Sequence, residues 1–358
     1  MVQKIRLSRD GVVESHRMQP YHLNQAKNQP AKRLGRLQKL LKTREPKICI
    51  VRGEGIGDVI MTTPTLHAIK EAFGTVQLHY ATNTRYLDGA LVKVLKYNPD
   101  VDEILERELL DDSQYDLVVN LHCPCIYYEK PSNPPINRID IFAQHAGIKL
   151  SDPQPRYFIQ KSEIEEGEDL IRAFYGKSIV IAQPFASTER RSLDLRRFRD
   201  VLQRLANEYN TMNLVLTHGS DFQSDITWDT IPNTAVLKDL DIRQIGGLMV
   251  HSNLVLCPDS SILHLAGALR VPTVALFGPT HPAARVNHYP EAVAVWKGDG
   301  LGPCPCWYTS CPVGNVCWDM MSVEEIVTAC GNHLQSANKV DILQLTKRRL
   351  ATIETEII

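Results

Sequence analysis

The chain has 358 residues, a formal net charge of −1 and 43% hydrophobic residues. This length is enough for two hydrophobic cores of ordinary size, so we expect two domains. The apolar and charged fractions are those of a globular protein. No apolar run reaches the roughly 18 residues that a membrane span needs, and the N-terminal region lacks the apolar core of a signal peptide. We therefore expect a cytoplasmic protein.

The near-zero net charge hides an asymmetry between the N-terminus and the rest of the chain. Residues 1–44 hold eleven Lys or Arg against two acids, a balance of +9, so the remainder carries −10. A basic arm on an acidic body predicts an anionic partner such as nucleic acid or a membrane surface, or else a solubilising or oligomerising extension. Four leucines share one face of a helix predicted over residues 31–43, which could pack on this chain or on another subunit: Leu34, Leu37, Leu40 and Leu41.

From residue 46 onward, short β-branched runs alternate with helical patterns, which is typical of parallel α/β units. We expect strands over 48–52, 75–80, 117–121, 179–182, 214–217, 254–257 and 273–277. We expect helices over 65–73, 163–175, 195–209, 242–251 and 262–269. Thr63 and Pro64 are typical of a helix cap followed by a first-turn proline. A proline-rich stretch over 131–155 is predicted to connect two halves.

A glycine-rich segment, GEGIGDVIMTTP over residues 53–64, follows the first predicted strand directly. Alternate glycines predict a strand-to-helix elbow, where the backbone approaches a ligand closely and the Asp58 carboxylate projects into the gap. At such a place a carboxylate is both fixed and accessible, as a general base must be. The alternative is that Asp58 only caps the following helix.

A second strand-to-helix junction lies two hundred residues later. Asp259, Ser260 and Ser261 open a predicted helix whose free N–H groups form an anion site. His264 lies on the same helix face as the two serines, so we expect it near the anion, although a histidine in an apolar helix is often a core residue.

Together these blocks resemble the family 9 glycosyltransferases, the ADP-heptose:lipopolysaccharide heptosyltransferases and their relatives, over roughly residues 46–335. The resemblance implies an α/β fold of the GT-B type, with two Rossmann-like doubly wound domains facing across a cleft. It implies that Asp58 matches the catalytic base and that Gly57 belongs to the donor site. It also implies that residues 259–264 bind the nucleotide diphosphate, with Ser261 where the family usually has glycine.

The expected domains follow from this resemblance. Residues 1–45 are a basic extension, 46–155 an acceptor domain, and 156–335 a nucleotide-sugar domain with a cysteine-rich loop over 303–318. Residues 336–358 are a C-terminal helix.

A further segment, residues 183–198, resembles the family segment in which a lysine precedes Trp-Pro and a helix. Arg191 stands at the lysine position, with Arg190 as its close competitor. Arginine keeps the positive charge but can clamp a phosphate with two hydrogen bonds. Ser187 and Thr188 could donate hydroxyl groups to the same phosphates. With this charge and a helix N-terminus at hand, no catalytic divalent metal is required.

Four cysteines fall within fourteen positions, among prolines and a glycine: Cys304, Cys306, Cys311 and Cys317. Four thiolates so close predict a structural zinc or iron site, with free thiols or disulfides as the alternatives. In relatives, similar cysteine segments occur without a known metal, while those that heptosylate proteins carry an iron-binding cysteine finger. Any metal here would hold a loop.

The sequence therefore predicts an inverting glycosyltransferase that uses a nucleotide sugar, with ADP-heptose as the expected donor. The family resemblance implies a lipopolysaccharide core acceptor, and the basic arm leaves a protein or a modified DNA base as alternatives. A different possibility is a non-catalytic sugar-nucleotide binding protein that retains the fold.

Overall fold

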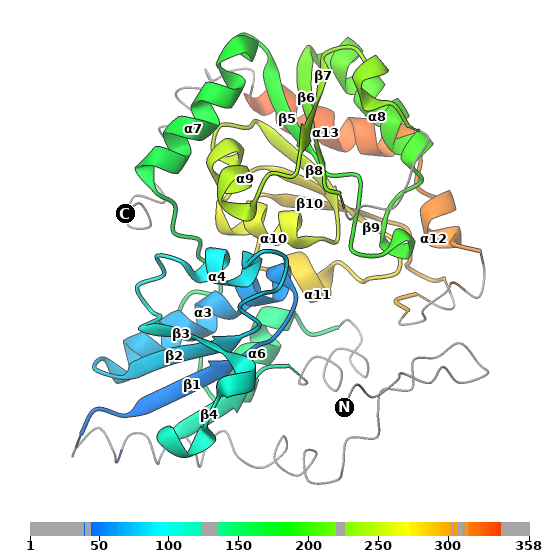
Figure 1. The fold of residues 1–358 in the computed structure, drawn as a ribbon. Helices are drawn as coiled ribbons and strands as arrows, with labels where there is room; N and C mark the ends of the chain where they lie inside the picture. Colours follow the sequence, from blue (N-terminus) through cyan, green and yellow to red (C-terminus); the bar gives the residue numbers. More distant parts are fainter. Residues whose placement is uncertain are drawn as a thin grey trace.

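The computed structural model describes residues 39, 44–122, 135–219, 226–301, 304–306, 311 and 314–337. These residues form two α/β units, one above the other in Figure 1, each built on a parallel sheet. The predicted basic extension and the C-terminal helix lie almost entirely outside the described residues.

The N-terminal unit holds a four-stranded sheet in the order β3-β2-β1-β4. Its strands are β1 (Lys47–Val51), β2 (Gln77–Thr82), β3 (Glu103–Glu106) and β4 (Leu117–Asn120), followed by the helices α3 (Ile56–Phe73), α4 (Ala90–Leu95) and α6 (Arg138–Ala146). Two short 3₁₀ turns, η1 (Arg107–Leu109) and η2 (Asp112–Gln114), lie between β3 and β4. Side chains alternate along β1, so that Ile48 and Ile50 join the core with the helices while Cys49 and Val51 pack on the opposite face.

The C-terminal unit holds a six-stranded sheet in the order β10-β9-β8-β5-β6-β7. Its strands are β5 (Ser178–Ala182), β6 (Thr211–Thr217), β7 (Thr234–Lys238), β8 (Leu254–Pro258), β9 (Thr273–Phe277) and β10 (Ala292–Trp296). Its helices are α7 (Lys161–Ile171), α8 (Leu195–Tyr209), α9 (Ile242–Met249), α10 (Ser261–Ala268), α11 (Ala283–Val286), α12 (Val316–Asp319) and α13 (Val323–Ala337), with 3₁₀ turns η3 (Arg172–Phe174), η4 (Glu189–Arg191) and η5 (Trp228–Thr230).

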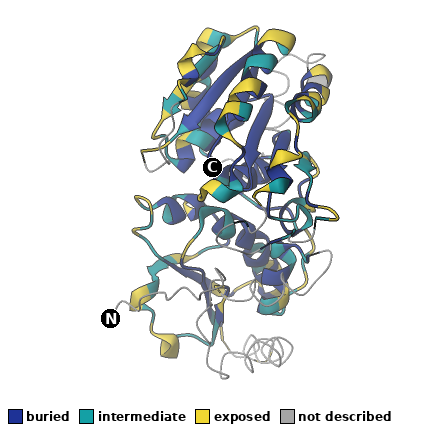
Figure 2. Cartoon of the chain, turned by 90° about the vertical axis from the view of Figure 1, so that its right-hand side faces the viewer, coloured by how far each residue is buried: buried dark blue, intermediate teal, exposed yellow. Residues whose placement is uncertain are grey.

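Both faces of the larger sheet are covered. Ile179 and Ile181 of β5 pack with the core of α9 and α10, whereas Val180 and Ala182 pack with α8 and α13. Figure 2 shows the strands as the most buried layer, with exposed residues on the outer sides of the helices and in the loops. Such a doubly covered parallel sheet confirms the expected α/β class.

Each of the seven predicted strands is present within a few residues of its expected position. The sequence patterns missed β3, β7 and β10. All three are edge strands of their sheets and carry mostly half-exposed residues, so they lack the buried apolar run by which the others were found.

The predicted start of the first helix at Thr63 and Pro64 is wrong. Helix α3 begins at Ile56, and Pro64 lies in its interior. A proline has no N–H to donate to the carbonyl group four residues earlier, here that of Ile60. The Thr63 hydroxyl donates to this carbonyl oxygen over 2.7 Å instead, which compensates for the missing hydrogen bond.

The two units meet where α3 packs on α10 and α4 on α9. Near this junction Asn137 caps α6 and also donates a hydrogen bond of 3.1 Å to the Ala283 carbonyl group of α11. His288 and Asp140 pair across the same boundary at 3.0 Å. Within the described ranges, none of the helices combines the length and the apolar character needed to cross a bilayer.

Candidate active site

A cavity of about 450 Å³ is lined by residues of both units. Its lining is strongly cationic, with five arginines against two acids, Glu54 and Asp58. The arginines come from both units, with Arg190 and Arg191 together in η4: Arg52, Arg138, Arg190, Arg191 and Arg285. Arg52 follows β1 and His122 follows β4 closely, so the carboxyl ends of both strands border this cavity, as expected for ligand sites of parallel sheets.

Asp58 lies in the first turn of α3, directly after the elbow. Gly55 has a φ of +84°, and a Cβ there would lie 2.7 Å from the Asp58 carboxylate, so glycine is required at that turn. The Asp58 side chain is 14% exposed and pairs with Arg52 and, at 2.6 Å, with Arg138. Burial raises the pKa of Asp58, but the two guanidinium groups outweigh it and hold that pKa well below its ordinary value.

Asp259 is a buried acid of the C-terminal unit and, like Asp58 in the N-terminal unit, it is paired with arginines. Its oxygens lie 3.5 Å from Nε of Arg285 and 3.6 Å from Nη1 of Arg191. Burial opposes ionisation, but these arginines lower the pKa of Asp259. Asp259 therefore holds two cations at the cavity rather than contributing an uncompensated negative charge.

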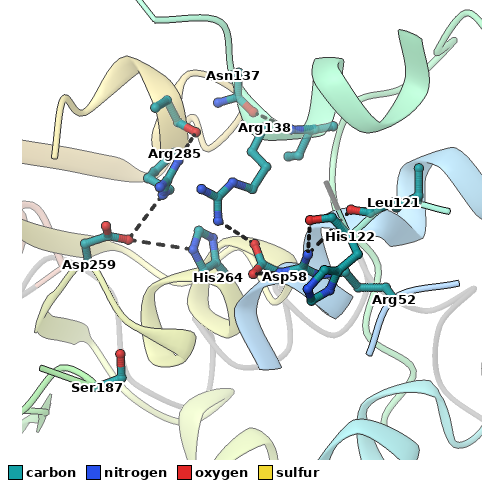
Figure 3. A network of polar contacts seen from close by, with 12 residues as sticks. Arg52, Asp58, Leu121, His122, Asn137, Arg138, Ser187, Asp259, His264 and Arg285 are labelled. Carbon is teal, nitrogen blue, oxygen red and sulfur yellow. Dashed lines mark hydrogen bonds and ion pairs between the residues drawn. The ribbon is translucent and has the colours of Figure 1, made fainter. Parts of the chain in front are cut away.

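His264 lies between the two acids, as Figure 3 shows. Its Nδ1 is hydrogen-bonded to the Tyr289 hydroxyl group at 2.7 Å. Burial lowers the pKa of His264 to about 4, although Asp259 acts in the opposite direction, so the imidazole is neutral at pH 7. A Cβ on Gly57 would lie 2.4 Å from the His264 ring, so the packing of α3 on this histidine of α10 requires glycine there.

The predicted phosphate-binding residues gather at two places. Arg191 belongs to η4 and also donates to the Ser187 hydroxyl group, and both residues line the cavity. Thr188 caps η4 and is exposed outside the lining. Ser260 is the N-cap of α10 and Ser261 its first residue; the buried Ser260 hydroxyl has no hydrogen-bond partner.

The cysteine-rich loop forms one wall of the cavity through Cys306, whose sulfur accepts a hydrogen bond of 3.0 Å from Arg190. Burial and the neighbouring Cys317 thiol raise the pKa of Cys304 to about 12. Cys311 accepts a hydrogen bond from the Asn315 backbone. All of these cysteines are free, and no group of three or more His, Cys, Asp or Glu among the described residues is arranged to hold a metal ion. Cys304 lies close enough to Cys306, Cys311 and Cys317 for their charges to act on its thiol. The zinc or iron site stays a prediction.

Sequence reasoning missed Arg52, Arg138 and Arg285 as site residues. Arg52 ends a predicted strand beside the elbow, so its position did carry a usable signal. Arg138 lies within the proline-rich stretch and Arg285 in a four-residue helix, where no sequence period marks a side chain that faces a cavity.

Comparisons with known proteins agree with this architecture. The sequence model of glycosyltransferase family 9 (heptosyltransferase) matches residues 128–316, which is more than half of the chain. The lipopolysaccharide heptosyltransferase 3 of Escherichia coli is 29% identical over 140 residues, covering 37% of this chain. That match spans only 40% of the relative's length.

Solved structures share the fold at low sequence identity. A family 9 glycosyltransferase of Veillonella parvula has a TM-score of 0.60 at 17% identity, over 81% of this chain and 97% of that one. The ADP-heptose lipopolysaccharide heptosyltransferase II of E. coli has a TM-score of 0.58 at 12% identity, over 82% and 99%. The iron-containing dodecameric glycosyltransferase TibC of E. coli has a TM-score of 0.59 at 12% identity, over 82% and 76%. Because the family model matches more than half of its residues, the chain belongs to glycosyltransferase family 9, the heptosyltransferase family.

Proposed function

We propose that this chain transfers a sugar from a nucleotide-diphosphate donor to an acceptor hydroxyl group, with inversion at the anomeric carbon. The observation that carries the proposal is the cavity in which one fixed carboxylate, Asp58, faces arginines from both units. A glycosyl transfer needs a base at the acceptor and positive charge at the departing diphosphate, and this cavity offers both.

In this mechanism the acceptor oxygen attacks the anomeric carbon directly. The bond from that carbon to the diphosphate breaks, and its electron pair leaves with the phosphate oxygen. Asp58 takes the proton of the acceptor hydroxyl group. Because attack and departure occur on opposite faces of the sugar, a single displacement inverts the anomeric centre.

Arg191, Arg285 and the N-terminus of α10 are the groups that would bind the diphosphate. Arg191 and Arg285 are held at the cavity by Asp259, which lowers the entropy lost when they bind a ligand. The Ser260 hydroxyl, buried and without a partner, stands at the same helix end. These cations supply the charge stabilisation that a divalent metal provides elsewhere, so we expect turnover to persist in EDTA.

We propose a heptose as the transferred sugar, with ADP-heptose as the donor and a lipopolysaccharide core as the acceptor. Support comes from the family to which the chain belongs and from a relative named as a lipopolysaccharide heptosyltransferase. A solved relative is likewise named for ADP-heptose.

The decisive experiment is mass spectrometry of the protein incubated with a panel of nucleotide sugars and candidate acceptors. A glycosylated acceptor together with free nucleoside diphosphate is the expected product pair. Asp58→Asn is expected to lower turnover by roughly 10²- to 10⁴-fold, the range for losing general acid–base catalysis. Binding of nucleotide sugar without transfer to any acceptor would favour a non-catalytic binding protein instead.

A further inference from the structure

The side chains that line the cavity from the C-terminal unit are held by partners of their own unit. Arg191 and Arg285 each pair with Asp259, at 3.6 Å and 3.5 Å. Arg190 donates a hydrogen bond of 3.0 Å to the Cys306 sulfur. This half of the cavity is therefore cationic and held in place before a ligand arrives, which suits the donor diphosphate.

The half that belongs to the N-terminal unit is different. Three of its lining side chains, Glu54, Tyr86 and His122, form no side-chain hydrogen bond or ion pair with any residue that the structure describes. Asp58, the other acid of the lining, is by contrast paired with two arginines. Polar side chains that line a cavity without partners are available to a ligand.

These three side chains lie close to the proposed base. The charges of Glu54 and Asp58 both act on the Tyr86 hydroxyl group, whose pKa is raised by burial and by these two acids. Both acids also act on the His122 imidazole, whose pKa is lowered by partial burial and by Arg52, so that the ring is neutral at pH 7. Figure 3 shows His122 beside Arg52 and Asp58. The acceptor hydroxyl group must stand in this region if Asp58 takes its proton.

Glu54 forms no ion pair within the described ranges of the chain, although Arg52 and Arg107 lie near the elbow. Arg52 pairs with Asp58 and donates to the His122 carbonyl group over 3.1 Å. Arg107 packs its guanidinium group against Gly53 and does not belong to the cavity lining. Glu54 therefore presents a negative charge to this half of the cavity without a counter-charge in contact with it.

The chemistry of the three side chains suits hydroxyl groups better than an anion. A carboxylate only accepts hydrogen bonds, whereas a tyrosine hydroxyl group and a neutral imidazole each donate and accept. Because a sugar hydroxyl group can do both, a polyol can satisfy all three. An ionised phosphate group has no hydrogen to donate to Glu54 and places a like charge beside it, which opposes binding.

We infer that Glu54, Tyr86 and His122 form the subsite for the acceptor and that Glu54 is its specificity-determining residue. Glu54 selects an acceptor hydroxyl group whose neighbours are uncharged hydroxyl groups, and it rejects one that stands next to a phosphate group. The inference rests on the proposed function. It narrows the acceptor to a saccharide that is not phosphorylated beside the attacked position.

Transfer from ADP-heptose to one oligosaccharide in two charge states tests this selection. The probe is the truncated inner-core oligosaccharide of a heptose-deficient lipopolysaccharide, freed of lipid, used with its phosphate groups and after their removal with hydrogen fluoride. We expect kcat/KM of the unmodified protein to be about tenfold higher for the dephosphorylated form, because like charges oppose binding of the other. In Glu54→Gln the two forms are expected to differ by less than about threefold.

Two further variants separate charge from hydrogen bonding. Tyr86→Phe keeps the Glu54 charge, so it is expected to raise KM for both forms and to leave their ratio unchanged. Glu108→Gln is the matched control, because Glu108 is an exposed acid of η1 outside the cavity lining, and it is expected to keep the ratio of the unmodified protein. ADP affinity, measured by calorimetry, is expected to be equal in all variants, since the donor cations are untouched.

Each result bears on the inference. Equal kcat/KM for the two forms in the unmodified protein, or the same preference in Glu54→Gln, would overturn the role of Glu54 while leaving the proposed function standing. Weaker ADP binding in Glu54→Gln would assign this residue to the donor instead. No transfer to either form would overturn both the inference and the proposed saccharide acceptor. Thermal melting verifies that each variant is folded, and Glu54→Ala replaces Glu54→Gln if the latter does not fold.

Discussion

His264 is a buried imidazole placed among charged groups, and its ionisation is linked to folding. In the unfolded chain it takes up a proton near pH 6.5, whereas in the folded protein burial lowers its pKa to about 4. Between these values the unfolded state binds more protons, so the free energy of unfolding falls as the pH falls. Below pH 4 this one group lowers the free energy of unfolding by about 3 kcal/mol relative to neutral pH.

We therefore expect His264→Asn to flatten the decrease in melting temperature between pH 6.5 and 4. Asparagine keeps a polar partner for the Tyr289 hydroxyl group but does not titrate. The matched control is His218→Asn, since that side chain is 53% exposed. An unchanged pH profile in His264→Asn would mean that another group causes the acid sensitivity.

Substitution of Arg191 tests whether this side chain binds the diphosphate of the donor. Arg191→Ala should weaken nucleoside diphosphate binding by roughly tenfold to a hundredfold, the usual cost of losing a charged hydrogen bond. Nucleoside binding should change little, because the lost interaction is with phosphate. Calorimetry with both ligands separates these cases. Equal losses for both ligands would indicate misfolding, and a loss found only in Arg190→Ala would assign the role to the neighbouring arginine.

At the scale of elements, helices α7 and α9 touch backbone to backbone. A Cβ on Gly247 would lie 2.0 Å from the Glu163 carbonyl oxygen, and one on Gly167 would lie 2.2 Å from the Gly247 carbonyl oxygen. No side chain fits at these two positions, so the helices can approach this closely only where both carry glycine.

Gly247→Ala is expected to destabilise the fold by about 1–3 kcal/mol, the range for overpacking a close contact. Chemical denaturation measures this change directly. Gly219→Ala is the control, because its Cβ would meet nothing closer than 3.7 Å and the residue is exposed. A Gly247→Ala protein as stable as the control would show that the two helices can separate without cost.

How well the sequence predicted these elements depended on their burial. Helix α8 was predicted at its observed limits because its apolar face repeats with helical period and Asp194 caps it. The elbow at Asp58 could be read from its glycines. Its partner Arg138 could not, because Arg138 is brought to Asp58 only by tertiary contacts such as that between Asn137 and Ala283.

At the scale of the whole molecule, the two-unit fold follows from alternating strand and helix patterns, but the domain limits at 45, 155 and 335 stay predictions. The described structure shows where the chain enters the first sheet: Arg44 pairs with Asp116 at the start of β4. The basic arm before it lies outside the described residues apart from Lys39.

The arm is expected to bind polyanions rather than to take part in sugar transfer. Its balance of +9 should be attracted to nucleic acid or to an anionic membrane, with affinity that falls steeply as salt rises. Two truncated proteins, one beginning at residue 31 and one at residue 44, separate the effect of the charges in residues 1–30 from that of the leucine-rich segment. The shorter protein keeps Arg44. Binding to DNA and to anionic vesicles at several salt concentrations, together with the oligomeric state, measures the effect. Truncated proteins with unchanged polyanion affinity, assembly and activity would leave the arm without this role.

Two tryptophans are hydrogen-bonded to the loops that line the cavity. The Trp318 indole donates to the Arg190 carbonyl group over 2.8 Å, and the Trp296 indole donates to the Gly278 carbonyl group over 3.1 Å. Pro279, next to Gly278, belongs to the cavity wall. A ligand that shifts either loop changes the polarity around an indole ring, and indole emission is sensitive to polarity. The unlabelled protein thus contains its own fluorescent reporter, through which occupancy of the cavity can be followed in real time.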